Sequence, residues 1–338
     1  MKSEHGGWGE ELCLGVVSCL WHSVSMKLIP PPENVAFAGL RALRTVALCD
    51  GEMHDIESAF LESVQKHILH TSYELDELNV ITPEELADVV TEPEFVERLV
   101  RALVFVALID GEASEEEDQL VGAYAKALKA DRAPVRELHR IAHHRLGLLR
   151  LDIARRGFIG ERGKQHLARK GFRGFVEAMR AITGRETPSL AEKYRALREY
   201  PDGTLGREYA RFIDANEFAF PGEVGGPPEP IVFHDCVHVL AEYGTSAEEE
   251  VQVVAFQAGA QSFDPFFSLM FVFAQFHLGI QISPIAGVDT EKIDPDTFLE
   301  AFVRGTKCTR DPTSDWDPWE DFENPLPEVR AAFGVAPR

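Results

Sequence analysis

The sequence has few basic residues for its length. It carries 34 Lys and Arg against 56 Asp and Glu, so its 338 residues have a formal net charge of −22. A surface this acidic excludes a protein that wraps nucleic acid as a whole, because contacts with phosphate groups require a basic face. With 45% hydrophobic and 27% charged residues, the chain has the composition of a folded protein. Its length favours two domains, each with a core of its own.

Cysteine is also scarce, and long hydrophobic runs are missing. The five cysteines are odd in number and lack the paired spacing of a metal site: Cys13, Cys19, Cys49, Cys236 and Cys308. This distribution argues against a disulfide framework and favours a reducing compartment, the cytoplasm. The run from Leu12 to Trp21 is too short to span a bilayer, and no basic segment of a signal peptide precedes it. We expect residues 1–32 to form a poorly structured extension.

The first third of the chain contains an internal duplication. RALRTVALCDGEMHDIE at 41–57 and RALVFVALIDGEASEEE at 101–117 share ten identities in seventeen positions at an offset of sixty. In each copy an apolar helical pattern leads into Asp-Gly-Glu, where the glycine can end the helix before a second one begins. We therefore expect an acidic helical domain over residues 33–130.

The acidic residues of the two copies have two interpretations. Four of them occupy equivalent positions and form a candidate second cation site: Asp50, Glu57, Asp110 and Glu117. The simpler interpretation is that such residues cap the following helices, where the helix dipole favours negative charge. Neither copy has the oxygen-ligand loop of an EF-hand. Both copies resemble the tellurite-resistance TerB-like family, and this resemblance implies an acidic helical bundle with a cation-binding or regulatory role.

Basic residues gather in the segment that follows. From Arg132 to Arg185 there are fourteen Lys and Arg against four Asp and Glu, so this stretch carries +10 and the remainder of the chain −32. We expect a basic helical bridge over residues 131–184. It meets either an anionic membrane surface or the acidic first domain of the same chain, with nucleic acid as the least favoured partner.

The strongest chemical pattern is His-Asp-Cys-Val-His at 234–238. His234 and His238 are four residues apart, so on a helix both imidazoles leave the same face and can hold one ion. Gly244 as a C-cap and Ser246 as an N-cap predict a turn into a second helix, which brings Glu250 back toward the histidines.

These residues predict a site for a divalent metal. Asp235 lies beside the histidine face, so it is either a third ligand or a group that orients an imidazole. The predicted ligand set is therefore His234, Asp235, His238 and Glu250. Nitrogen and carboxylate donors together favour Zn or Fe, with Mn, Co and Mg as alternatives, over Ca.

A second short motif lies upstream, where a turn at Thr204 leads into an amphipathic helix. Together the two motifs resemble the ubiquinone-biosynthesis Coq-four family over about residues 185–305. Thr204, Gly206 and Tyr209 match the family's Thr-Leu/Phe-Gly-x-x-Tyr turn, and His234, Asp235, His238 and Glu250 match its HDxxH motif followed after eleven residues by Glu. The sequence departs from the family just before the histidines, where Pro230–Phe233 replaces an Arg-Tyr-Arg segment.

The Coq-four resemblance implies an all-helical fold, a divalent metal and a bound polyprenyl or quinone-type lipid. It also implies association with the membrane and with other quinone-biosynthesis proteins, and a role in replacing a ring carboxyl group by hydroxyl. In that role Asp235 and Tyr209 are the catalytic candidates, and Thr204, Gly206 and Tyr209 shape the ring end of the pocket.

A phenylalanine-rich segment follows the metal motif. FDPFFSLMFVFAQF at 263–276 contains six of the chain's twenty-two phenylalanines. The apolar stretch from Pro265 to Ile280 is short for a membrane span. It predicts either a fully buried core helix or a helix that faces an isoprenoid tail, a membrane surface or a homodimer interface. In the second case Phe266, Phe267 and Phe271 contact the lipid.

The sequence as a whole predicts a mainly α-helical protein with two helical domains. A TerB-like bundle over 33–130 and a Coq-four-like metal- and lipid-binding domain over 185–310 are joined by the bridge over 131–184. An aromatic, acidic tail over 311–338 is expected to pack on the second domain.

The predicted function is metal-assisted oxidative decarboxylation and hydroxylation of a prenylated aromatic ring, by a cytoplasmic protein peripheral to the inner face of the cytoplasmic membrane. Two alternatives stay open. One is a non-catalytic isoprenoid-binding scaffold for a quinone-biosynthesis complex. The other is an HD-type metal phosphohydrolase, which would require two further ligands, with His166 and Asp264 as the candidates.

Overall fold

The computed structural model describes residues 28–283, 287–314 and 316–338. This part of the chain folds into fifteen α-helices with short 3-10 and π turns, and its only β-type pairing consists of two isolated bridges. The predicted all-α fold class is confirmed. Of the extension expected at 1–32, residues 1–27 lie outside the described residues, and residues 28–32 are described. None of the helices in the described residues is long and apolar enough to cross a membrane.

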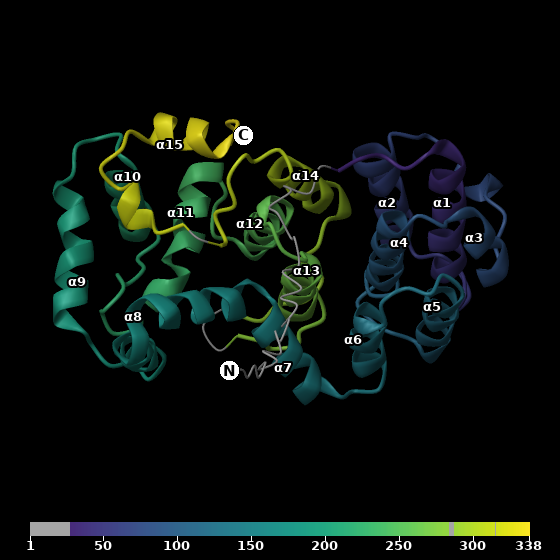
Figure 1. Ribbon diagram of the computed structural model, residues 1–338, viewed down its shortest axis with the longest axis horizontal. Coiled ribbons are helices and arrows are strands. Elements are labelled where there is room, and N and C mark those ends of the chain that lie inside the picture. The colour runs from purple at the N-terminus through teal and green to yellow at the C-terminus, as the bar shows by residue number, and fades with distance from the viewer. Residues whose placement is uncertain (1–27, 284–286, 315) are drawn as a thin grey trace, which may run out of the picture.

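The duplicated sequence forms two equivalent helix pairs. They are α1 (Glu33–Ala47) with α2 (Asp55–Val64), and α4 (Pro93–Val106) with α5 (Glu115–Ala127). In chain order the short α3 (Pro83–Val89) comes between the two pairs. The turns inside the pairs contain Gly51 and Gly111, whose φ angles of 144° and 96° favour glycine because they are strained for a residue with a Cβ. These helices form one end of the molecule (Figure 1).

The basic segment forms three helices that run from this end toward the other. They are α6 (Ala133–Ala142), α7 (Leu146–Arg156) and α8 (Phe158–Ile182), which bends at Gly171. Several of its arginines bind groups in the bridge itself or in the second half of the chain. Arg140 pairs with Asp152 at 2.7 Å, and Arg150 donates to the Gln281 carbonyl oxygen at 2.7 Å.

The second half contains the remaining seven helices. They are α9 (Pro188–Arg195), α10 (Leu205–Ala215), α11 (Val232–Ala241), α12 (Ala247–Ala260), α13 (Phe266–Val272), α14 (Pro295–Gly305) and α15 (Leu326–Phe333). Helices α12 and α14 cross at two glycines. A Cβ on Gly259 would lie 2.0 Å from the Phe302 carbonyl oxygen, and one on Gly305 would lie 2.0 Å from that of Phe256. The small residues therefore let the two backbones touch, which fixes the position of α12.

The two halves are packed against each other. Phe105 of α4 stacks on Phe273 with ring centroids 4.7 Å apart, and His277 Nε2 lies 2.7 Å from the Ile109 carbonyl oxygen. Lys66 pairs with Asp296 at 2.8 Å. The buried side chains form one continuous cluster that runs through both halves. Figure 1 shows α12, α13 and α14 between the first helices and the group formed by α9, α10, α11 and α15.

The phenylalanine-rich segment is a buried core helix, as its first interpretation predicted. Helix α13 ends at Val272 and continues as a π turn over Phe273–His277, and every residue of both is buried. The tail packs on the second half as expected. Trp316 is fully buried, contacts the Phe333 ring edge to face with centroids 4.8 Å apart, and donates from Nε1 to Asp321 at 2.8 Å.

Candidate metal centre

Two helices and the turn between them position the histidine motif. His234 and His238 lie one turn apart on α11, and Ser246 caps α12 by accepting a hydrogen bond from the Glu249 amide, as predicted. The predicted C-cap at Gly244 is wrong. Helix α11 ends at Ala241, and its C-cap is Glu242, which takes the left-handed conformation with a φ of 61°. Gly244 instead donates its amide to Glu249 at 3.0 Å, in a space where a Cβ would meet that carboxylate.

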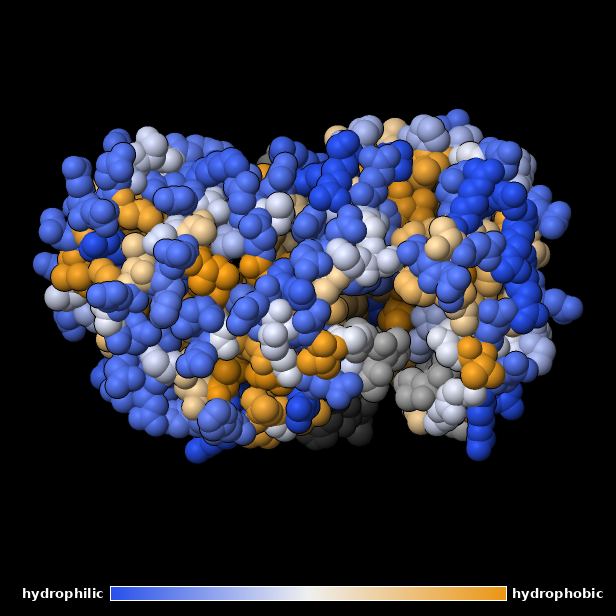
Figure 2. All heavy atoms as spheres, turned by 180° about the vertical axis from the view of Figure 1, so that it is seen from behind, coloured by the Kyte–Doolittle hydropathy of each residue, from blue (hydrophilic) through white to orange (hydrophobic). Residues whose placement is uncertain are grey.

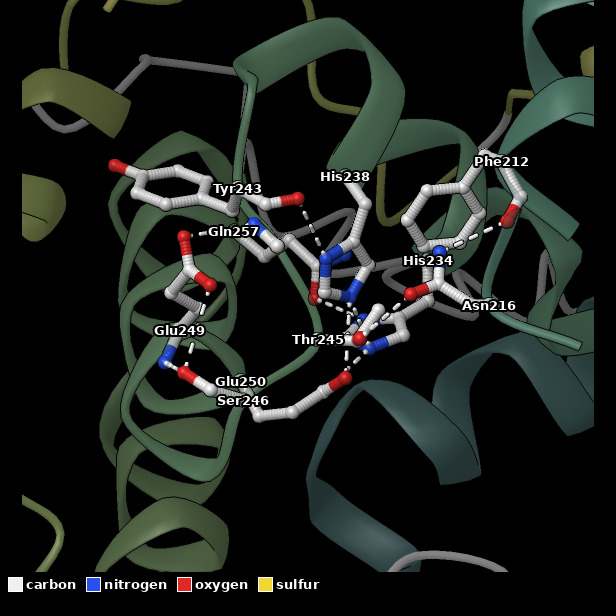
Figure 3. A network of polar contacts seen from close by, with 11 residues as sticks. Phe212, Asn216, His234, His238, Tyr243, Thr245, Ser246, Glu249, Glu250 and Gln257 are labelled. Atoms are coloured by element: carbon white, nitrogen blue, oxygen red, sulfur yellow. Dashed lines mark hydrogen bonds and ion pairs between the residues drawn. The ribbon is translucent and has the colours of Figure 1, made fainter.

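The turn brings Glu250 onto the two imidazoles (Figure 3). His234 Nε2 lies 3.2 Å from Glu250 Oε2, and His238 Nε2 lies 3.4 Å from Glu250 Oε1. The two Nε2 atoms are 3.2 Å apart. Three donor atoms therefore converge on one point, in a group whose atoms all lie within 4.8 Å of one another.

The contacts of Nδ1, the other nitrogen of each ring, indicate which nitrogen carries the proton. His238 Nδ1 lies 3.2 Å from the Tyr243 carbonyl oxygen, and His234 Nδ1 lies 3.2 Å from Gln257 Oε1. Because both oxygens accept hydrogen bonds, they favour a proton on each Nδ1, and in a neutral ring Nε2 then presents a lone pair. Two lone pairs and a carboxylate repel one another unless a cation or a proton lies between them.

The spacing of the three atoms fits a metal ion. Ligands about 2.0–2.1 Å from a tetrahedral ion lie about 3.3–3.4 Å apart, close to the distances in this group. A proton is the alternative. Burial by itself would lower the pKa of His234, but the hydrogen bond and charge of Glu250 raise it to about 9. Burial by itself would raise the pKa of Glu250, but the hydrogen bonds and charges of both imidazoles hold it well below the usual range.

The surroundings orient the rings and leave one side of the group accessible. Phe212 stacks on the His238 ring at 5.3 Å, and Phe158 lies parallel to the His234 ring at 6.4 Å. The His238 side chain is buried, whereas those of His234 and Glu250 are 19% and 26% exposed. An ion held here would keep positions open for water or a substrate.

Asp235 does not join the three converging residues. Its burial raises the pKa of the carboxyl to about 6, while the two imidazoles act in the opposite direction. It lies close enough to Tyr209 for its charge to act on that phenol, whose pKa is raised well above the usual value, mainly by burial. The Tyr209 hydroxyl is buried and has no hydrogen-bond partner among the described residues.

The other two residues of the upstream turn have clear packing roles. Thr204 caps α10 by accepting a hydrogen bond from the Arg207 amide at 3.3 Å. Gly206 lies against the tail, where an added Cβ would come within 2.9 Å of the Phe322 carbonyl oxygen. Tyr209 stacks on the Phe322 ring at 5.6 Å. This turn therefore anchors the tail beside α10.

The three phenylalanines expected at the lipid are divided among different surroundings. Phe266 lines an apolar cavity of about 210 Å³ between helices α1, α2 and α4, which we call the first module together with α3 and α5, and helices α13 and α14. The Arg156 guanidinium lies 4.0 Å above the Phe267 ring, and Phe271 contacts Phe158 edge to face at 5.8 Å. No residue of the histidine group lines this cavity.

The acidic residues of the duplication divide between the two interpretations. Glu57 accepts from the His54 amide at 2.7 Å, and Glu117 accepts from the Ser114 amide at 2.9 Å, so both cap helices. Burial, the largest effect, raises the pKa of each glutamate to about 7. Asp50 and Asp110 come together with His54, within 4.8 Å of one another.

The candidate ligands for a phosphohydrolase lie elsewhere. Asp264 pairs with Arg101 at 3.2 Å and accepts from the Phe266 amide at 3.0 Å. His166 lies in α8 beside a separate pocket lined by Tyr194 and Glu229. Neither residue belongs to the group formed by the motif histidines and Glu250.

Sequence reasoning missed several residues that the structure brings to ligand groups. Gln257 lies two turns after Glu250 on the same face of α12, a spacing that could have indicated it. His54 joins Asp50 and Asp110, and a further group consists of Asp118, His139 and His143. The last two histidines have the same spacing as the motif pair, which was the available signal.

No protein-family model matches the chain, and a comparison with curated proteins finds no match. The two family resemblances therefore rest on the residues that carry their motifs.

Proposed function

We propose that His234, His238 and Glu250 hold a catalytic divalent ion, with Zn or Fe favoured. The proposed reaction is that implied by the Coq-four resemblance, replacement of a ring carboxyl group by hydroxyl on a prenylated aromatic compound. One observation carries the proposal: the Nε2 atoms of two imidazoles and a carboxylate converge at 3.2–3.4 Å on a partly exposed point. This is the donor geometry of an ion with open coordination positions.

The residues around the group supply the remaining roles. In the overall reaction the ring carbon would lose carbon dioxide and gain a hydroxyl group, a two-electron oxidation that requires an external oxidant such as dioxygen. The ion would act as a Lewis acid on a ring oxygen or carboxylate. Asp235, whose pKa is about 6, can exchange a proton near neutral pH. The Tyr209 hydroxyl, which has no hydrogen-bond partner among the described residues, is the donor that we assign to the ring of the substrate.

A matched pair of variants on one helical turn tests the proposal. Glu250→Gln removes the ligand charge, whereas Glu249→Gln changes a neighbouring carboxylate that contacts Gly244 and Ser246 instead (Figure 3). Metal content, measured by mass spectrometry on purified protein, should fall more than about tenfold in the first variant and stay unchanged in the second. The first variant should also fail to restore quinone synthesis in a deficient bacterial strain. Normal quinone content with the metal lost would refute the catalytic role.

A lipid-binding scaffold is the second candidate function. The apolar cavity supports it, because Phe266, Leu269 and Phe298 line a space of about 210 Å³ that is independent of the histidine group. Lipid that co-purifies with a folded but metal-free Glu250→Gln protein, together with retained quinone synthesis, would favour this scaffold over the enzyme.

We also propose that the bridge contacts an anionic membrane surface. Large apolar side chains are exposed along α7 and α8, among the basic residues of the segment: Leu148, Leu151, Leu167, Val176 and Met179. Basic side chains next to exposed apolar ones are the pattern of helices that lie on anionic lipid. Figure 2 shows the molecule from behind, where hydrophobic residues are exposed in several places within a mainly hydrophilic surface.

A further inference from the structure

Another group of side chains with potential metal-ligand atoms lies in the opposite half of the molecule, where α5 and α6 pack together. His139 Nδ1 is 2.7 Å from Asp118 Oδ2, and His143 Nε2 is 3.4 Å from the same oxygen. The donor atoms of the three residues all lie within 4.8 Å of one another. We propose that Asp118, His139 and His143 bind a divalent transition-metal ion that fastens α6 to α5.

The local structure explains why these three side chains meet. His139 and His143 are one turn apart, and His143 ends α6 by donating its amide to the His139 carbonyl oxygen at 3.1 Å. The two rings therefore leave the same face, with centroids 4.1 Å apart. Asp118 stands in the first turns of α5, against which α6 packs. The ligands thus come from two helices, one in the acidic module and one in the basic bridge.

The burial of the three side chains suits a site that an ion can reach without opening the fold. The Asp118 side chain is only 10% exposed, whereas those of His139 and His143 are 44% and 34% exposed. The carboxylate therefore forms the base of the site and the imidazoles form its solvent side. Among the described residues, Asp118 forms ion pairs with these two imidazoles alone.

The chemistry of the donors restricts the ion. Two imidazoles with one carboxylate favour Zn, Co, Ni or Cu over Mg and Ca, which prefer oxygen ligands. Three protein ligands leave positions for water. The donor set equals that of the centre on α11 and α12, but there the second nitrogen of each ring lies at hydrogen-bonding distance from an oxygen, whereas His139 and His143 lie against each other. Since such outer contacts strengthen metal sites, we expect this second site to bind more weakly.

An ion in this site would act on the connection between the two halves. Helix α6 leads directly into α7, and α7 packs against α13 beside the cavity and the core of the second half. A ligand that binds only the folded chain stabilises it in proportion to its occupancy. Metal supply would therefore set how firmly the bridge is attached to the first module.

The experiment is a Co²⁺ titration of the full chain, followed by the visible absorption of the bound ion and by equilibrium dialysis. The wild-type chain should bind two equivalents with different affinities. Asp118→Asn keeps the size of the side chain and His139→Ala alters a half-exposed ring, so circular dichroism should show both variants folded. Each should lose the weaker equivalent and keep the tighter one. His144→Asn, at the neighbouring histidine with a φ of 53°, is the matched control and should keep both.

The two metal sites are separated by a further variant. Glu250→Gln should keep the weaker equivalent, and Co²⁺ should still raise the midpoint of its thermal unfolding. That rise should disappear when Asp118→Asn is added. The proposal is overturned by Asp118→Asn and His139→Ala proteins that bind Co²⁺ with wild-type stoichiometry and affinity, or by a Glu250→Gln protein that binds none.

Discussion

Two buried glutamates of the first module should make the stability of this protein depend on pH in an unusual direction. Glu57 and Glu117 cap α2 and α5 and are both buried. Burial, the largest effect, raises the pKa of each from 4.5 to about 7, although the capping hydrogen bonds oppose it, and the charges of Asp50 and Asp110 act on both in the same direction as burial.

The direction and size of the effect follow from these pKa values. Because the folded pKa lies above the ordinary value, the folded chain binds more protons than the unfolded chain between about pH 4.5 and pH 7. Their contribution to the free energy of unfolding is therefore largest at low pH and is lost as the pH rises through this window. A shift from 4.5 to about 7 corresponds to at most about 3 kcal/mol for each glutamate. Since the same aspartates act on both, we expect about 2–5 kcal/mol for the pair.

The double variant Glu57→Gln/Glu117→Gln isolates this contribution. Glutamine keeps an oxygen that accepts the capping hydrogen bond, but it has no charge at any pH. Urea unfolding in the presence of EDTA should show nearly equal stability of variant and wild type at pH 4.5. At pH 8 the variant should be the more stable by about 2–5 kcal/mol.

Glu85 provides the control, because it caps α3 with the same hydrogen-bond pattern but is exposed. Its contacts with Thr82 hold its pKa below the usual value, so Glu85→Gln should change stability in the opposite direction. The reasoning is refuted if the difference between wild type and the double variant is the same at pH 4.5 and pH 8.

The remaining predictions concern packing and membrane contact. Gly259→Ala should destabilise the fold by about 1–3 kcal/mol in urea unfolding, because its Cβ would meet α14 backbone, whereas Gly122→Ala has free space and should stabilise α5 slightly. A stable Gly259→Ala protein would contradict the close crossing of α12 and α14. Leu148→Ser/Leu151→Ser should weaken co-sedimentation with vesicles that contain anionic lipid, and Val80→Ser, at an equally exposed apolar residue outside the bridge, should not. Binding that does not depend on anionic lipid would remove the membrane proposal.

Much of the candidate metal centre could be predicted because its rules are local. The spacing of His234 and His238 sets both rings on one helix face, since a helix repeats every 3.6 residues. Ser246 starts the next helix because its side chain satisfies an amide at the helix end. The same reasoning failed at Gly244, because a left-handed residue can also be non-glycine, and Glu242 takes that conformation here.

Other features depended on contacts between distant segments. Asp235 is one residue from His234 and therefore leaves α11 in another direction, but its raised pKa follows from burial and from the charge of Glu250 on α12, against the effect of the two imidazoles. The sequence left capping and cation binding open for Glu57 and Glu117, and burial decided how each carboxyl titrates. Phe266, Phe267 and Phe271 looked alike in sequence, but only Phe266 faces the cavity.

The sequence by itself determined the helices, the duplication and the two-histidine face, because hydrogen bonds and side-chain periodicity within a few residues suffice for them. Only the tertiary structure decided that Tyr243 and Gln257 contact the Nδ1 atoms of the two rings, and that α5 and α6 bring Asp118 to a second pair of histidines. These arrangements require helices to pack at particular positions, and packing depends on the shape of the whole core rather than on any short stretch of residues.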